Sequence, residues 1–345
     1  MKVCLTRIHS LLVASVLLMA ASSCGKEVLP QEGKLCVRVI YPVSGFGDGG
    51  YVDGIYRGVC ISGRTFPGLI VENYCPESIR HAEGAIEDWL YPSEDDRQFS
   101  RRLLILADGS HTDILRSHPE WKIPKNGTIL LLDSTDPLPS HWKDVCTRMV
   151  CGYGASYLAG IVASACGFSS SAVVCANPVH SAVHELCKGF IDGFRSDGGE
   201  LDDEDVYYLA SDAFEGFDKA DQLFRLANEL DKKYKFVFPV CGGSSQGLYR
   251  YTREFPDSFS TCGIDSDMQA YSDHVIFSIE KRMDLMVEDA INEWVTESKL
   301  GQNVVLGLSS GYIRVEFSDW FKKSDSIIES AYSRGLDAEK EYLGI

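Results

Sequence analysis

Residues 259–284 read FSTCGIDSDMQAYSDHVIFSIEKRMD, and this stretch indicates the fold class. The apolar run at 259–264 has the length of a β-strand and is followed at once by Asp265. A second apolar run at 274–279 comes next, and Lys281 follows it closely. Buried strands with polar groups just beyond their ends are typical of a parallel sheet, where the ligand site lies at the carboxyl ends of the strands.

The same pattern recurs along the chain. Further apolar runs of strand length cover 35–43, 103–107, 128–132, 172–176, 206–210, 235–241 and 304–308. Segments with the apolar spacing of helices lie between them, at 78–90, 155–166, 181–195, 217–230 and 283–300. Strands that alternate with helices predict βαβ units, so the expected fold class is α/β with mostly parallel sheets covered on both faces. A length of 345 residues favours two domains.

The first residues have the pattern of an export signal. Lys2 and Arg7 precede an apolar segment at 11–21, which is shorter than the ~20 residues that a membrane-spanning helix needs. Small residues and then Cys24 follow, an arrangement that resembles a bacterial lipobox. We therefore expect a signal peptide at 1–23 and a lipidated tether at 24–33, which begins at an acylated Cys24. Plain cleavage with an incidental Cys24 is the alternative.

From this signal we expect the mature protein in the bacterial cell envelope, anchored to a membrane by lipid and facing the periplasm or the exterior.

The chain has 33 Lys and Arg against 50 Asp and Glu, a net charge of −17. A nucleic-acid partner is therefore not expected, because such a partner needs a basic surface.

The sequence carries no specific signal for a catalytic or cofactor site. It contains no CxxC pair and no Walker A motif, and its glycine-rich segments, taken as isolated signals, are more often tight turns than phosphate-binding loops. We therefore predict no catalytic residue, no metal site and no cofactor.

The segments that follow the expected strands carry the candidate ligand-binding groups. A glycine-rich segment at 44–51, SGFGDGGY, follows the first strand, and CGGSSQG at 241–247 follows a later one. Asp265 and Lys281 follow the last two runs of the opening stretch. Aromatic rings, bare backbone amides, carboxylates and one lysine suit a small polar ligand with a flat part.

Six segments in a fixed order carry a family resemblance. They are GFGDGGYVDGIYRG at 45–58, ASYLAG at 155–160, GFIDG at 189–193, CGGSS at 241–245, GIDSD at 263–267 and SIEKRMD at 278–284. Together, over about residues 36–310, they resemble the basic membrane protein (BMP) family of nucleoside-binding lipoproteins of ABC transporters.

The resemblance implies the type I periplasmic-binding-protein fold. This fold has two lobes, each a mostly parallel sheet flanked by helices, with the ligand in the cleft and closure by hinge motion. We expect lobe one at 34–150 with 268–300 and lobe two at 151–267 with 301–345.

The implied function is capture of a nucleoside, most readily a purine nucleoside, for an ABC permease, with no enzymatic activity. One alternative is a ligand-sensing lipoprotein of similar fold that binds another ribose-bearing or small polar ligand and is not coupled to transport. The other is a nucleoside-cleaving enzyme that uses Asp48 or Asp265 as acid or base, although the sequence lacks an early aspartate cluster of the calcium-binding kind.

The sugar end of the site is implied by two residues. Asp265 matches the family aspartate that accepts hydrogen bonds from the ribose hydroxyls, and Lys281 matches the lysine that reaches the sugar. The residues alone leave other roles open. Asp265 could cap a helix, and Lys281 could form an ion pair with Asp284 or Asp267.

The base end of the site matches the family less well. Tyr51 matches the aromatic residue that stacks on the base, with Asp48 beside it, while Gly242 and Gly243 offer backbone groups. Tyr51 could instead pack at the start of a helix. Val52 replaces a family asparagine, and the second stacking phenylalanine is missing from its usual place, where Phe214 or Phe217 could substitute. A nucleoside-like ligand is therefore better indicated than a purine specifically.

Overall fold

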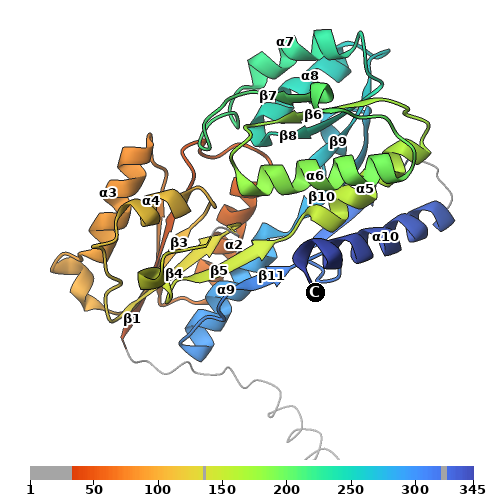
Figure 1. Cartoon of the computed structure of the whole chain (residues 1–345). Helices are drawn as coiled ribbons and strands as arrows, with labels where there is room; N and C mark the ends of the chain where they lie inside the picture. Colours follow the sequence, from red (N-terminus) through yellow and green to blue (C-terminus); the bar gives the residue numbers. More distant parts are fainter. Residues whose placement is uncertain (1–32, 135–136, 320–324) are drawn as a thin grey trace, which may run out of the picture. The chain divides into compact units, whose positions relative to one another are not determined.

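The first of two sheets has the strand order β11-β5-β4-β3-β1-β2, and every neighbouring pair is parallel. The computed structural model describes residues 33–134, 137–319 and 325–345 (Figure 1). The strands of this sheet are β1 (Lys34–Ile40), β2 (Leu69–Tyr74), β3 (Phe99–Leu106), β4 (Gly127–Leu132), β5 (Cys146–Val150) and β11 (Val304–Leu306).

Alternation along the strands decides which helices cover each face of this sheet. Successive strand residues point to opposite faces. Val37 and Val39 of β1 pack in the cluster that contains residues of α2 (Tyr51–Thr65) and α9 (Met283–Glu297). Ile40 packs instead in the cluster that contains residues of α3 (Ile79–Leu90) and α4 (His111–Ser117).

The second sheet has the strand order β12-β10-β9-β8-β6-β7. Its pairs are parallel except for β10 with β12, which is antiparallel. The strands are β6 (Ser171–Cys175), β7 (Val206–Tyr208), β8 (Phe236–Val240), β9 (Ser260–Asp265), β10 (Val275–Lys281) and β12 (Ile313–Phe317).

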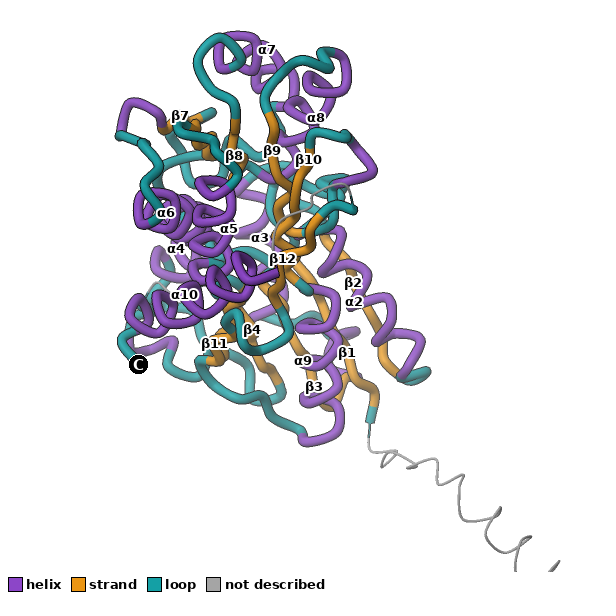
Figure 2. Tube along the Cα trace, turned by 90° about the vertical axis from the view of Figure 1, so that its right-hand side faces the viewer, coloured by secondary structure: helices purple, strands orange, loops and turns teal. Residues whose placement is uncertain are grey.

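Two pairs of helices accompany the second sheet. One pair is α5 (Tyr153–Ala165) with α6 (Ser181–Ser196), and Phe190 of α6 stacks 4.1 Å from Phe238 of β8. The other pair is α7 (Ala220–Leu230) with α8 (Ser245–Glu254). The last helix, α10 (Asp325–Leu343), lies along α5 (Figures 1 and 2). Short 3₁₀ helices cover Asp95–Gln98, Ser140–Trp142, Asp203–Asp205, Gly242–Ser244 and Gln269–Tyr271.

The predicted α/β class and the two mostly parallel sheets are confirmed, but two strands lie in the lobe opposite to the expected one. The range 268–300 was expected in lobe one, yet β10 pairs with β9 in the second sheet, and only α9 returns to the first. The range 301–345 was expected in lobe two, yet β11 pairs with β5 in the first sheet. The chain therefore passes between sheets after β5, after β10 and after β11.

The N-terminal predictions fall on residues outside the structural description. Residues 1–32, which hold the predicted signal peptide, Cys24 and nearly all of the tether, are not described. Within the described ranges, no helix combines the length and the apolar character needed to cross a bilayer.

Candidate functional site

A cavity lies where the carboxyl ends of strands from both sheets meet. It encloses about 1000 Å³ of empty space, including open solvent at its mouth. From the first sheet it receives the segment after β1 and the aspartates that follow β3 and β4, and from the second sheet the ends of β8, β9 and β10. Strand ends are where parallel α/β proteins bind ligands, because loops rather than helices cover that edge.

The structure brings all the sequence-predicted ligand residues to this cavity. Its lining includes Asp48, Tyr51, Gly242, Gly243, Asp265 and Lys281.

Asp265 has an open carboxylate. It is the last residue of β9 and has a left-handed φ of 69°, a conformation that Asp tolerates better than most residues. The Gly-rich segment lies against it, since a Cβ at Gly50 would come within 2.9 Å of the Asp265 Cβ. Among the described residues, none donates a hydrogen bond to its carboxylate. Burial raises the pKa of Asp265 to about 7, a rise that Lys281 opposes.

Lys281 forms an ion pair across the two sheets. Its Nζ donates to Asp133 Oδ2 at 2.8 Å, and both side chains are almost completely buried. Burial opposes its charge, but Asp133, Glu185 and Asp265 together raise the pKa of Lys281. The partner is therefore neither Asp284 nor Asp267, and Asp284 pairs instead with Arg282.

Asp48 caps a helix. Its Oδ1 accepts from the backbone N–H groups of Gly50 and Asp53 at 2.9 and 3.2 Å, and its Oδ2 accepts from that of Val52 at 2.8 Å. A carboxylate at this place satisfies N–H groups that the first turn of α2 leaves unpaired. Asp48 thus lines the cavity with both oxygens already engaged.

The two predicted glycines allow close approach of the chain. Gly242 has a left-handed φ of 52°. At Gly243 a Cβ would come within 3.0 Å of the Phe217 carbonyl and 3.6 Å of the Asp48 Cα. Gly243 therefore lets the segment after β8 lie close to the Gly-rich segment of the other sheet.

Aromatic rings supply flat surfaces in the cavity. Tyr51 is the first residue of α2, packs partly against the core, and lines the cavity. Its buried hydroxyl has no hydrogen-bond partner among the described atoms. Phe217 also lines the cavity, so it is a candidate for the second stacking position.

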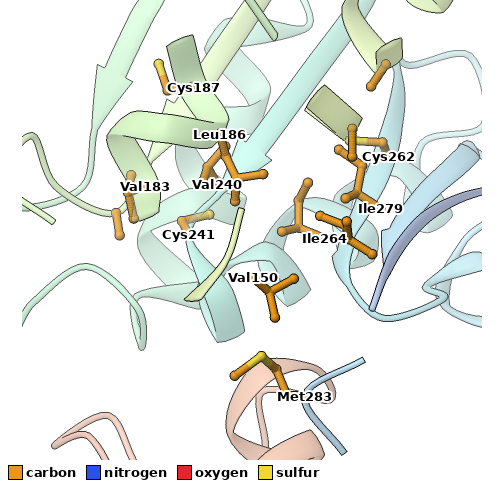
Figure 3. Packing of buried hydrophobic residues seen from close by; sticks show 14 of the residues in the cluster. Val150, Val183, Leu186, Cys187, Val240, Cys241, Cys262, Ile264, Ile279 and Met283 are labelled. Carbon is orange, nitrogen blue, oxygen red and sulfur yellow. The ribbon is translucent and has the colours of Figure 1, made fainter. Parts of the chain in front are cut away.

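The apolar wall of the cavity comes from α6, β8 and β9. Val183 and Leu186 of α6 lie beside Val240 and Cys241 at the end of β8, and Ile264 of β9 completes the set (Figure 3). These side chains give a cavity with apolar walls and a few converging polar groups, as is usual for small-ligand sites.

Sequence reasoning missed three charged residues of the cavity. Asp108 and Asp133 follow β3 and β4, and His180 precedes α6. His180 Nε2 lies 3.3 Å from both carboxylate oxygens of Asp108, so this pair also joins the two lobes. The signal for the aspartates was present, because both follow apolar runs that were recognised as strands. No comparable signal marked His180.

Asp108 and His180 each stabilise the charged form of the other. Burial opposes the charge of Asp108, but His180 holds the pKa of that carboxyl well below its usual range. Burial likewise opposes the charge of His180, while Asp108 raises the pKa of the imidazole. Across the described ranges, no group of three or more His, Cys, Asp or Glu side chains is arranged to hold a metal ion.

Two lobes with a cavity at their facing strand ends form the architecture that solute-binding proteins of the periplasmic type have. The family model described as "Bmp: ABC transporter substrate-binding protein PnrA-like" matches residues 134–342, more than half of the chain. The chain belongs to this family, whose members bind a small-molecule substrate for an ABC transporter outside the cytoplasm. The match includes Gly242, Gly243, Asp265 and Lys281 and begins after Asp48 and Tyr51.

Solved structures support the fold. A solute-binding protein of an ABC transporter system from Aeropyrum pernix K1 is 17% identical, with a TM-score of 0.65 over 88% of this chain and 86% of that one. A carbohydrate transporter solute-binding protein from Agrobacterium radiobacter, in complex with D-arabinose, is 14% identical, with a TM-score of 0.60 over 88% and 99%. A transcriptional activator of the comK gene from Bacillus halodurans is 15% identical, with a TM-score of 0.63 over 88% and 96%. A search of curated proteins gives no match.

Proposed function

We propose that this protein captures a nucleoside between its lobes and delivers it to an ABC importer. The observation that carries the proposal is the open carboxylate of Asp265, which faces the same cavity as the rings of Tyr51 and Phe217. A ribose diol supplies two O–H donors to one carboxylate, and a base supplies the flat surface that an aromatic ring needs.

The expected energies suit reversible capture. Hydrogen bonds to a charged group contribute about 1.5–3 kcal/mol each, and stacking of a base on an aromatic ring about 1–3 kcal/mol. Micromolar affinity needs about −8.2 kcal/mol, so one stacked base and a bound diol are of the right order after ordering costs. Closure of the lobes would bury the ligand and present a new surface to the permease.

Thermal unfolding of the mature domain without Cys24 tests the proposal. We expect ribonucleosides to raise the melting temperature, because a ligand at about 100 Kd adds about 2.7 kcal/mol to the free energy of unfolding. Ribose and the free bases, measured as controls, should give much smaller shifts, since each fills only part of the cavity. A panel in which ribose stabilises as well as any nucleoside, or in which no nucleoside stabilises, would overturn the proposed ligand class.

We also propose that acylated Cys24 holds the protein on a membrane. In cells that express the whole sequence and are fed an alkyne-labelled fatty acid, we expect label on the mature protein and its recovery in the membrane fraction. The Cys24→Ala variant should lose the label and move to the soluble fraction, because two acyl chains are needed for stable anchoring. Cys60→Ala is the matched control and should keep both properties. Unchanged labelling of Cys24→Ala would contradict the anchor.

A further inference from the structure

The hydrogen-bond capacity of the cavity is unevenly used. Of the carboxylates that line its interior, Asp48, Asp108 and Asp133 have both oxygens engaged by donors. Asp218 also lines the cavity, but its side chain is largely exposed at the surface. Asp265 alone presents a half-buried carboxylate that accepts no hydrogen bond from the described residues. If a ribose diol occupies Asp265, no carboxylate oxygen in the described interior of the cavity is left open to a further donor.

His180 lines this cavity and has one ring nitrogen without a hydrogen-bond partner among the described atoms. Its side chain is 7% exposed, and its ring meets that of Phe217 edge-on, with centroids 5.5 Å apart. Nε2 faces the Asp108 carboxylate, so Nε2 carries the proton there. Nδ1 is buried and has no hydrogen-bond partner among the described atoms. A buried N–H without an acceptor costs about 1–3 kcal/mol, which a ligand acceptor would recover as the lobes close.

The charges around His180 come from both lobes. Asp108 and Asp133 favour the protonated ring, and Lys281 opposes it. Asp265 also interacts with the ring, and so does His111 of α4, whose own pKa is lowered by burial. The carboxylates prevail over burial, and the pKa of His180 is raised. The ring is therefore a double donor when protonated, with Nδ1–H the free one.

We propose that His180 makes the site select nucleosides whose base presents a carbonyl oxygen over those that present an amino group. This inference rests on the proposed function. The Nδ1–H of the imidazolium donates to a carbonyl oxygen, as in hypoxanthine or uracil. An exocyclic amino group, as in adenine or cytosine, brings a second donor to that place and leaves both donors unpaired.

The preference for carbonyl bases should depend on pH. Deprotonation of His180 removes the hydrogen from Nδ1, because Asp108 keeps the one on Nε2, and Nδ1 then becomes an acceptor. The preference for carbonyl bases therefore shrinks or reverses as the pH rises through the pKa of His180. Titration of Asp265 affects every ribonucleoside alike, so it cancels in the ratio of two affinities.

Two matched ligand pairs test this inference by calorimetry. Inosine has an oxygen at C6 and a hydrogen on N1 where adenosine has an amino group and a bare N1, and uridine and cytidine differ in the same way at C4 and N3. At about pH 6 we expect the carbonyl member of at least one pair to bind about tenfold more tightly, the effect of one hydrogen bond. At about pH 8, where the ring N–H groups of inosine and uridine are still largely protonated, the ratio should fall toward one. Equal affinities within both pairs at about pH 6, or a ratio that does not change with pH, would overturn the inference.

Two variants test whether the affinity ratio depends on His180 itself or on any histidine substitution in this part of the protein. His180→Gln should reduce the ratio at about pH 6 to within about threefold and abolish its pH dependence, since the charged donor is gone. His184→Gln, on the exposed side of the same helix, should keep the wild-type ratio at both pH values. A His180→Gln ratio equal to that of the wild type would contradict the assignment. Absence of binding by every nucleoside would instead overturn the proposed function itself.

Discussion

Replacing Asp265 by Asn is expected to weaken nucleoside binding about a hundredfold or more, measured by calorimetric titration. The reason is that the carboxylate accepts charge-assisted hydrogen bonds from both ribose hydroxyls, whereas the amide offers one neutral acceptor oxygen and a donor that opposes the second hydroxyl. Asn tolerates the left-handed φ of 69° at this position, so the backbone is preserved.

The control for this variant is Asp267→Asn, which changes an exposed neighbour that does not line the cavity. It should bind like the wild type. Asp265 also predicts a pH dependence, because its pKa is raised to about 7 and the diol binds the ionised form. Affinity should therefore rise as the pH increases through that value, and in Asp265→Asn this part of the dependence should vanish. Wild-type affinity in Asp265→Asn would contradict the assigned role.

Replacing Lys281 by Met is expected to lower the free energy of unfolding by about 3–5 kcal/mol, measured by urea denaturation. The change removes one member of a buried ion pair and leaves the almost completely buried Asp133 carboxylate without its cation. Nucleoside binding should fall as well, since Lys281 lies at the proposed sugar end of the cavity.

A matched control and a second-site variant test the cause of this loss. Lys188→Met removes an exposed pair with Asp192, at 2.7 Å with side chains 45% and 31% exposed, and should cost less than about 1 kcal/mol. Adding Asp133→Leu to Lys281→Met should restore part of the stability, because no buried charge is then left unpaired. A cost for Lys281→Met no greater than that for Lys188→Met would rule out a stabilising role of the buried pair.

The fold class was predictable because most strands here are continuous apolar runs. Three strands were missed, β2, β5 and β12 (Ile313–Phe317), and the first two show the limit of that signal. β2 (LIVENY) lies at the edge of its sheet and is largely exposed, so only its first half is apolar. β5 (CTRMV) contains a buried arginine, Arg148, whose partner Glu293 is 145 residues away in the chain. A search for apolar runs alone misses such a strand, because it cannot show that the charged residue is paired with a residue so far along the chain.

The path of the chain between lobes was less predictable than its elements. β11 and β12 are separated by only a few residues, yet they belong to different sheets. Both strands are short, and their sequences do not indicate which strand each one pairs with. The same problem affects the site, because the pairs Lys281–Asp133 and His180–Asp108 depend on how the two lobes face one another.

The candidate site itself was predicted in part by a general rule. Polar residues just beyond strand ends proved to line the cavity, and consistent use of that rule would have added Asp108 and Asp133. The family pattern placed Asp48 beside the base, whereas its oxygens are engaged by the first turn of α2. The capping pattern of an aspartate ahead of a helix start would have indicated that engagement.

The measurement that tests the central claim most directly is a calorimetric titration of the wild-type protein with inosine and with 2′-deoxyinosine. If the cavity holds a ribonucleoside with its diol on Asp265, inosine binds, and 2′-deoxyinosine binds at least about tenfold more weakly because one donor to the Asp265 carboxylate is missing. Equal affinities for the two ligands, or no heat of binding with inosine, would contradict the account.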